Sequence, residues 1–171
     1  MKKYELTAEF IEKWGKKLFR IKALISFGNV EAGELGGYVE KEDNLAQDDN
    51  AWVHGNARVF GNARVCDDAR VCGNARVYGD ARVYGDADYL LIGRIGSRFS
   101  FTTFFKNKDK GITVSCGCFL GTIAEFRAKV SDTHGNNKHA KIYNLAADMA
   151  ELQILGEEHF ENLNTNKSEP F

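Results

Sequence analysis

Four side chains in the last third of the sequence have the chemistry of metal ligands. Cys116 and Cys118 are separated by one residue, and His134 and His139 flank a Gly-Asn-Asn turn. Two thiolates and two imidazoles form a ligand set that zinc accepts. Structural zinc sites usually space their cysteines more widely, however, and a Cys-x-Cys pair on one face of a strand is as easily part of a core. The sequence therefore favours buried thiols and solvent-exposed histidines, with no metal and no cofactor.

Arginine and tyrosine side chains at fixed positions of a short repeat form a second candidate group. Arginine beside an aromatic ring suits an anionic or protein partner. Like charges stacked at strand spacing are unfavourable unless they are compensated, and residues 45–98 contain seven aspartates for seven arginines. The sequence favours a structural charge lattice and leaves a binding surface as the alternative. The residues of that surface would be Arg58, Arg64, Arg76, Tyr78, Arg82 and Tyr84.

The repeat that positions these arginines includes GNARVFGNARVCDDARVCGNARVYGDARVYGDA, residues 55–87. Alanine recurs at every sixth residue from Ala51 to Ala87, and valine does so from Val53 to Val83. Each unit has four alternating residues and a two-residue corner of Gly, Asn or Asp, which tolerate left-handed backbone angles. Such a unit is typical of a solenoid in which three units form a triangular coil and residues three repeats apart stack. Alanine and valine then point inward, and arginine points outward.

These units resemble the hexapeptide-repeat family of left-handed β-helix proteins, which place an aliphatic residue at every sixth position and a small residue two before it. The likeness covers about residues 45–95, where seven units keep phase. The flanking segments FGNVEAGELGGYVEKEDNLAQDDNAWV and IGRIGSRFSFTTFFKNKDKGITVSCGCF extend it to transferase-like bacterial hexapeptide proteins and small prophage-borne relatives. The resemblance implies a left-handed solenoid and prisms that pack side by side as oligomers.

The resemblance also implies an enzymatic alternative at His54, the one histidine in the solenoid. Acyltransferases of the family use a histidine as general base, which takes a proton from an acceptor hydroxyl or amine. They also need a groove for an acyl carrier and often a loop that interrupts the coil, and this repeat has no such loop. The sequence therefore favours an outward-facing His54 without a catalytic role.

The predicted fold is mainly β, with a short left-handed parallel β-helix of about three coils over residues 45–95. The flanks are expected to cap it, because an open solenoid exposes sheet edges. Residues 1–44 are predicted as an N-terminal β cap, with a hairpin over residues 4–25 around Gly15 and a first corner at Gly36-Gly37. Residues 96–156 are predicted as an α/β cap of two strands and two helices, and residues 157–171 as a polar tail that frays.

The two predicted helices are distinguished by their start signals and apolar stripes. The first begins with a capping box from Thr122 to Glu125, followed by a stripe of Ile123, Phe126 and Val130. The second runs over about residues 137–155. Its predicted inward face consists of Ile142, Leu145, Met149 and Leu152.

Composition excludes several classes of function. The chain has 23 basic and 24 acidic residues, balanced along its length, which argues against a nucleic-acid partner. No apolar run approaches the length of a transmembrane helix, and MKKYELTAEF lacks the apolar core of a signal peptide. We therefore expect a cytoplasmic protein with no membrane partner and with its four cysteines reduced.

The absence of a catalytic arrangement predicts a non-catalytic binding or interaction protein, and the resemblance to prophage-borne relatives implies that it belongs to a phage or other mobile element. The same resemblance implies a host protein as partner, such as a defence protein that this chain inhibits. One alternative is a hexapeptide-type acyltransferase that uses acyl-CoA with His54 as base. A second is a sponge for a small anionic, nucleotide-like ligand. We also expect a homo-oligomer, a trimer or a dimer, with the outward side chains of the solenoid as contact surface.

Overall fold

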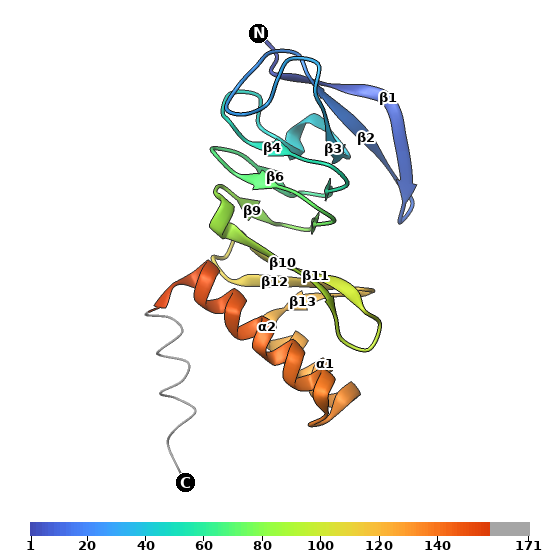
Figure 1. The fold of residues 1–171 in the computed structure, drawn as a ribbon, viewed down its shortest axis with the longest axis vertical. Coiled ribbons are helices and arrows are strands. Elements are labelled where there is room, and N and C mark those ends of the chain that lie inside the picture. Colours follow the sequence, from blue (N-terminus) through green and yellow to red (C-terminus); the bar gives the residue numbers. More distant parts are fainter. Residues whose placement is uncertain (158–171) are drawn as a thin grey trace. The chain divides into compact units, whose positions relative to one another are not determined.

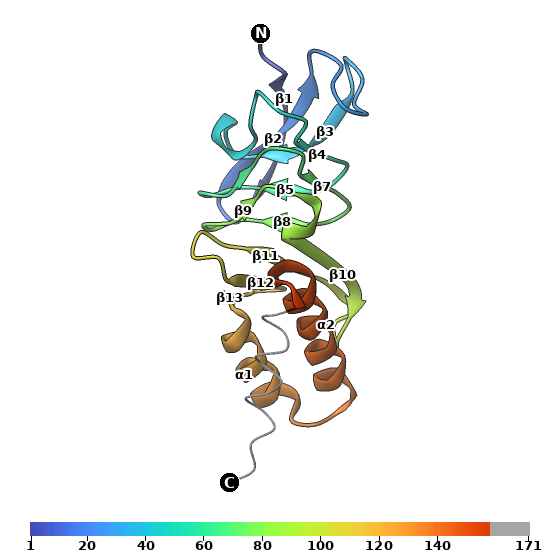
Figure 2. The ribbon, with the colours of Figure 1, turned by 90° about the vertical axis from the view of Figure 1, so that its left-hand side faces the viewer.

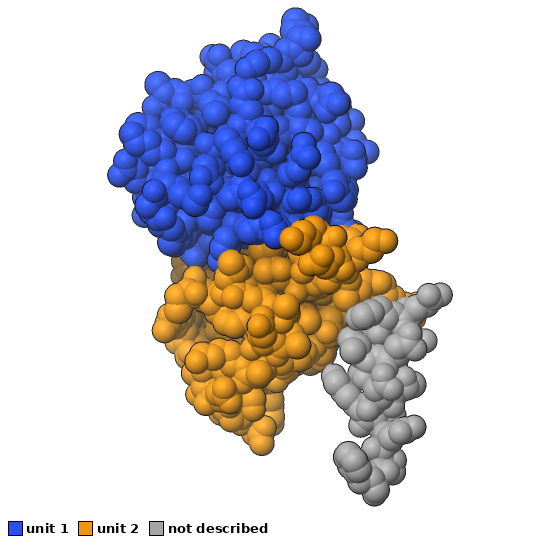
Figure 3. All heavy atoms as spheres, turned by 180° about the vertical axis from the view of Figure 1, so that it is seen from behind, with its two compact units in different colours: residues 1–88 blue, residues 89–171 orange. Residues whose placement is uncertain are grey.

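The computed structural model describes residues 1–157 of the chain. It divides into two compact units, residues 1–88 and residues 89–171, coloured separately in Figure 3. The first unit consists of strands with two 3₁₀ turns, Glu42–Asn44 and Asp86–Asp88. The second combines a four-stranded sheet with two helices, so the fold is mainly β as predicted. No helix within residues 1–157 is long and apolar enough to cross a membrane. The predicted polar tail lies, from residue 158 on, outside the described residues.

Each repeat of the first unit forms a strand of two residues, and each strand pairs in parallel with the strand three repeats away. In Figure 1, β6 lies above its partner β9. The predicted solenoid repeat is thereby confirmed. Its strands are β4 (Trp52–Val53), β5 (Arg58–Val59), β6 (Arg64–Val65), β7 (Arg70–Val71), β8 (Arg76–Val77) and β9 (Arg82–Val83).

The alanine and valine positions fill the interior of this solenoid. Every one of them from Ala51 to Val83 has at most 1% of its surface exposed. The corners bend through residues with positive φ, which are glycines in most units. In the third unit Asp67 takes this place with a φ of 58°, because aspartate tolerates the left-handed region better than most side chains do.

Strand β3 (Leu35–Val39) joins the solenoid ahead of the first repeat. Tyr38 pairs in parallel with Arg58, and Leu45 forms an isolated bridge with Val65. Strand β3 therefore pairs with a repeat strand, whereas the sequence placed residues 1–44 in a cap; Leu45 lies in the predicted solenoid. The repeat pattern did not reveal this pairing, because Leu45, which pairs like a valine of the repeat, is followed by the first valine, Val53, only after eight residues.

Gly36 and Gly37, which were expected to set a corner, lie inside β3. A Cβ atom on Gly36 would lie 2.5 Å from the side chain of Ile21, and one on Gly37 would lie 2.6 Å from the carbonyl oxygen of Ala57. Glycine is required here because neighbouring chain approaches the backbone of β3 closely, not because the chain turns.

The N-terminal residues form the predicted hairpin. Strands β1 (Tyr4–Lys13) and β2 (Lys16–Ala23) pair antiparallel, and Trp14 and Gly15 turn between them with positive φ. Strand β2 also pairs with β3, so one sheet runs in the order β1-β2-β3-β5-β8. The hairpin thus extends one face of the solenoid, and Figure 1 shows it along the side of the coils.

The second unit has four antiparallel strands where the sequence predicted two. They pair in chain order as β10 (Tyr89–Ile95), β11 (Ser100–Lys106), β12 (Ile112–Cys116) and β13 (Phe119–Thr122). Residues 89–95 were expected in the repeat. Tyr89 falls where the repeat needs valine, and the narrow interior of a triangular coil has no space for a phenol ring. Arg94, which could have stacked on Arg76, therefore lies in β10 instead.

Helices α1 (Ile123–His134) and α2 (Lys138–Leu155) cover one face of this sheet (Figure 2). The predicted capping box is formed, since the Thr122 hydroxyl accepts from the Glu125 N–H and the Glu125 carboxylate accepts from the Thr122 N–H. Arg127 of α1 holds α2 by donating to Asp148 at 2.7 Å and to the buried Glu151 at 2.6 Å.

The predicted inward face of α2 is wrong. Leu145, Met149 and Leu152 are 63%, 57% and 45% exposed, and Ile142 is only partly buried. Alanines let the helix backbone approach the sheet and α1 closely, so here the small residues mark the core rather than the large apolar ones. The buried apolar residues of α2 are Ala140, Tyr143, Ala146, Ala147, Ala150 and Ile154.

Candidate functional site

The arginine ladders form as predicted from the spacing. Arg58 pairs in register with Arg76, and Arg64 pairs with Arg82 on another face. Burial lowers the pKa of Arg58, and the charge of Arg76 lowers it further. The arginine ladders therefore form, and the positive charges of Arg58 and Arg76 repel each other.

The aromatic side chains beside one ladder stack on each other. The rings of Phe60 and Tyr78 are stacked with centroids 4.5 Å apart, and Trp14 of the hairpin stacks on Phe60 at 5.1 Å. The Arg76 guanidinium lies over the Trp14 ring at 5.3 Å. Tyr78 and Arg76 thus contribute to attaching the hairpin to the solenoid side. These two candidate binding residues have a structural role.

The corner aspartates accept hydrogen bonds from backbone N–H groups and from asparagine amides. Asp86 accepts from the Arg70 N–H at 2.8 Å, and Asp88 accepts from the Tyr84 N–H at 2.9 Å. Asp68 accepts from the Asn50 amide one coil away at 3.0 Å. Asp68 and Asp86 therefore tie one coil to the next through neutral donors, whereas compensation of the arginine charges by the aspartates stays a prediction.

Arg64 and Tyr84 line a groove on the first unit whose other charged residues are acidic. Glu42, Asp43 and Asp48 border the same groove. Arg82 is turned to backbone oxygens, because its guanidinium donates to the carbonyls of Asn62 and Ala81. Three carboxylates around one arginine make this face of the solenoid unfavourable for an anionic ligand.

His54 is half-buried on the solenoid. Burial lowers its pKa, an effect opposed by Glu34 and Asp86 and reinforced by Arg70. A neutral imidazole results at physiological pH, since the ordinary histidine pKa is already below 7. His54 does not line the pocket described next.

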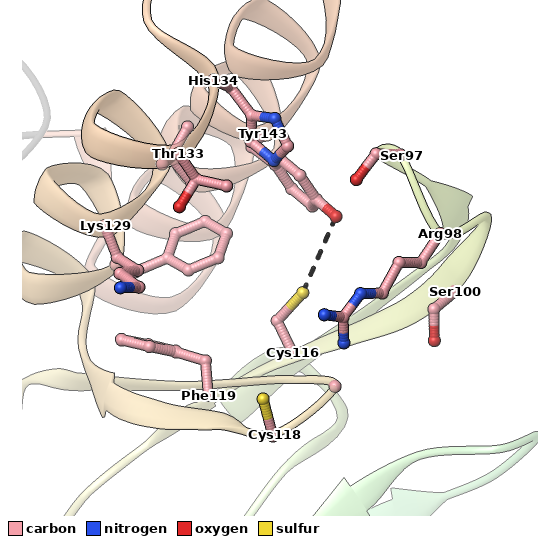
Figure 4. A pocket seen from close by; sticks show the side chains of 13 residues that line it. Ser97, Arg98, Ser100, Cys116, Cys118, Phe119, Lys129, Thr133, His134 and Tyr143 are labelled. Carbon is pink, nitrogen blue, oxygen red and sulfur yellow. Dashed lines mark hydrogen bonds between the residues drawn. The ribbon is translucent and has the colours of Figure 1, made fainter.

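An open pocket of about 200 Å³ lies within the second unit (Figure 4). Arg98, on the turn after β10, reaches toward it from one side, and Lys129 of α1 lies on the other. Phe119, Phe126 and Val130 give it an apolar wall. Hydroxyl groups complete the lining, contributed by Ser97, Ser100, Thr133 and Tyr143.

The pocket lining is electropositive. Those of the described residues that line it include Arg98, Lys129 and His134 and no aspartate or glutamate. Among residues 1–157, neither Arg98 nor Lys129 has a carboxylate within ion-pair distance. Two cations that share a concave surface without a counter-charge favour an anionic ligand.

Tyr143 presents a hydroxyl group to the centre of this pocket (Figure 4). Burial, together with the neighbouring Cys116, raises the pKa of Tyr143 to about 12. The phenol is therefore protonated at neutral pH and able to donate a hydrogen bond. Gly96, with a φ of 73°, makes room for it, because a Cβ atom there would overlap the Tyr143 oxygen.

The four candidate zinc ligands are only partly brought together. Cys116, Cys118 and His134 line the pocket, and the rings of His134 and His139 lie 5.7 Å apart. Cys118 sits in the turn between β12 and β13, not on a strand face with Cys116, because Gly117 turns the chain with a φ of 61°. Within the described residues no three His, Cys, Asp or Glu side chains are grouped closely enough to hold a metal ion.

Arg98 and Lys129, the two cations of the pocket, were not among the candidates from the sequence. Neither belongs to a repeat or a motif, and they lie on a turn and a helix that are distant in the chain. The one sequence signal was that Lys129 lies between Cys118 and His134, two residues proposed as metal ligands, whereas Arg98 precedes Cys116 by 18 residues. The structure assembles these parts by packing α1 and α2 on the sheet.

Comparison with known families yields one match, to the model described as YdcK beta solenoid repeat, over residues 69–85. This segment contains β7, β8 and β9 of the first unit. The pocket of the second unit lies outside the matched residues. No curated protein matches the chain. The match agrees with the parallel strand pairing and supports a β-solenoid repeat family for this part of the chain.

Proposed function

We propose that this protein is a non-catalytic binding protein whose second unit captures a small anionic ligand with an apolar body, such as a nucleotide-like molecule. The solenoid serves as a rigid support. The observation that carries the proposal is the lining of the pocket. Arg98 and Lys129 lie on opposite sides of a pocket with an apolar wall, and among the described residues they have no carboxylate partner and no acidic residue lines the pocket.

The parts of the pocket correspond to the parts of such a ligand. Arg98 offers a planar fork of N–H donors, which matches the oxygens of a phosphate or carboxylate. Lys129 adds a second positive charge and the Tyr143 hydroxyl a neutral donor. Phe119 and Phe126 offer ring surfaces on which an apolar or planar group can pack. Binding of this kind needs no general acid or base.

Titration calorimetry with adenosine monophosphate, inorganic phosphate and adenosine tests the proposal. We expect adenosine monophosphate to bind best, because it alone offers both a charge and a ring. Arg98→Ala should weaken binding at least about tenfold, as expected for the loss of hydrogen bonds to a charged group. Binding should also weaken as salt is raised.

Arg94→Ala is the matched control, because Arg94 is exposed, lies on the same β10–β11 hairpin and does not line the pocket. It should bind like the wild type. Absence of binding for all three probes at millimolar concentration would overturn the proposal, and so would equal losses in Arg94→Ala and Arg98→Ala.

Acetyl-CoA is the probe for the acyltransferase alternative. It carries a nucleotide, so weak binding that depends on Arg98 is compatible with the proposed pocket. Acetyl-CoA binding that is kept in Arg98→Ala, together with acyl transfer to an acceptor that is lost in His54→Ala, would instead support the acyltransferase. His54 lies in the first unit, so the two variants separate the hypotheses cleanly.

A host protein as partner, a phage or mobile-element origin and a cytoplasmic location stay part of the proposal. They rest on the resemblance to prophage-borne hexapeptide proteins and on the composition. Capture from a bacterial lysate with the full chain tests the protein partner. A partner retained by wild type and lost in Arg98→Ala would connect that interaction to the pocket.

The finer architecture also belongs to the proposal. We infer left-handed coils of the hexapeptide type, about three in number, with both ends of the solenoid capped. The inference is supported by the six-residue spacing, by parallel pairing of Trp52 with Arg70 and by the β1–β2 hairpin that extends one face. An experimentally determined structure with right-handed coils would contradict it.

A further inference from the structure

Helix α2 carries an apolar stripe on its exposed face. Leu145, Met149 and Leu152 are 63%, 57% and 45% exposed, and Ile142 continues the line one turn earlier. The spacing of three, four and three residues follows one side of a helix, as in the contact seam of helix pairs. The opposite side of α2 already packs on the sheet and α1. The helix therefore has a second apolar face that no described residue covers.

The spacing of the stripe is symmetric about residue 147. Leu145 and Met149 lie two residues to either side of this position, and Ile142 and Leu152 lie five to either side. A second copy of α2 placed antiparallel across a two-fold axis would oppose Leu145 to Met149 and Ile142 to Leu152. A two-fold interface requires this kind of self-complementary surface.

The charged residues on the exposed side of α2 are also placed so that opposite charges meet in an antiparallel pair. Lys138 and Lys141 are exposed in the first turns of the helix, and Glu157 is exposed just after its end. In the antiparallel pair, Lys138 of one copy lies near Glu157 of the other. The macrodipoles of the two helices are also opposed, which is favourable.

We propose that two copies of this chain associate through antiparallel packing of their α2 helices, with the Ile142–Leu145–Met149–Leu152 stripe as the contact. This surface is independent of the ligand pocket and of the arginine faces of the solenoid. The partner is a second copy because, in an antiparallel pair, each apolar side chain of the stripe meets another of the stripe and Lys138 meets Glu157.

Sedimentation equilibrium of the full chain at micromolar concentration tests the proposal. We expect a species of twice the 19.1 kDa chain mass. Leu145→Glu and Met149→Glu should each weaken association at least about tenfold, because each puts a charge opposite an apolar side chain at the centre of the contact. Leu120→Glu is the control, since Leu120 is 45% exposed in the same unit but lies on β13, and it should leave association unchanged.

A charge exchange tests the antiparallel arrangement without altering the apolar stripe. Lys138→Glu should weaken association, and Lys138→Glu combined with Glu157→Lys should restore it. Equal weakening in the single and the double variant would overturn the arrangement.

The remaining outcomes also decide the proposal. A wild-type chain that stays at 19.1 kDa overturns it. A full chain that stays monomeric, and that associates only after residues 158–171 are removed, also overturns the proposal. In that case the C-terminal residues of the same chain would cover the stripe. Association lost in an Arg82→Glu variant and kept in Leu145→Glu would assign the contact to the solenoid instead.

Discussion

Val59→Asp is expected to leave the first unit largely unfolded under conditions in which the wild type is stable. Val59 is fully buried, and its strand β5 lies between β3 and β8, so the new carboxylate has a coil on either side. A buried carboxylate without a partner costs several kcal/mol, roughly 4 or more, which is a large part of the 5–15 kcal/mol that holds a typical domain together. The interior has no space in which the side chain could turn toward water.

Urea unfolding followed by tryptophan fluorescence measures this effect, because both tryptophans, Trp14 and Trp52, lie in the first unit. The matched control is Asn56→Asp, which adds the same charge three residues away at an exposed corner. The repeat itself places aspartate at this corner position in other units, and we expect a change below about 0.5 kcal/mol. Equal stability of the two variants would mean that the valine positions do not face the interior.

The repeat made the first unit predictable from sequence. An inward alanine and valine at fixed spacing leave a strand no freedom in register, because a shift of one residue would turn arginine into the interior. The pairing of Arg58 with Arg76 and of Arg64 with Arg82 followed directly. Strand β3 was missed, since its glycines and the longer interval before Val53 break the pattern.

The second unit was harder to predict because its elements depend on each other. The face of α2 was assigned by the size of its apolar residues, whereas tertiary packing selected alanines. Lys3 shows the same limit in the first unit, since it is 2% exposed and donates to the carbonyls of Asp49 and Ala51. A lysine in the sequence gives no sign of such a role.

The pocket could not be predicted for a related reason. Its cations come from the turn after β10 and from α1, and they share no spacing rule. The sequence did point to Cys116, Cys118 and His134, three of its lining residues, but for metal binding. The sequence could predict that this region contains residues able to bind a ligand. It could not predict that they line one cavity together with Arg98 and Lys129.

Arg127→Ala is expected to destabilise the second unit by roughly 3 kcal/mol, the low end of the cost of removing one partner of a buried ion pair, because Glu151 is nearly buried and Arg127 itself is 23% exposed. Arg127 donates to Asp148 and Glu151 in successive turns of α2, and the Glu151 side chain is only 7% exposed. Without the guanidinium, a nearly buried carboxylate would be left unpaired between the two helices. Thermal unfolding followed by far-UV circular dichroism reports this unit, because both α-helices belong to it.

The cause of this loss can be separated from simple loss of packing by a second substitution. Arg127→Leu combined with Glu151→Leu removes both charges and keeps apolar volume between α1 and α2. Replacement of a buried pair by packed apolar residues is often neutral or stabilising, so the double variant should recover most of the stability that Arg127→Ala loses. Lys129→Ala, on the same helix and exposed, should unfold like the wild type. A double variant as unstable as Arg127→Ala would show that the ion pair itself, through its hydrogen-bond geometry, holds the helices in place. A stable Arg127→Ala would show instead that apolar packing alone positions α1, and with it the Lys129 side of the pocket.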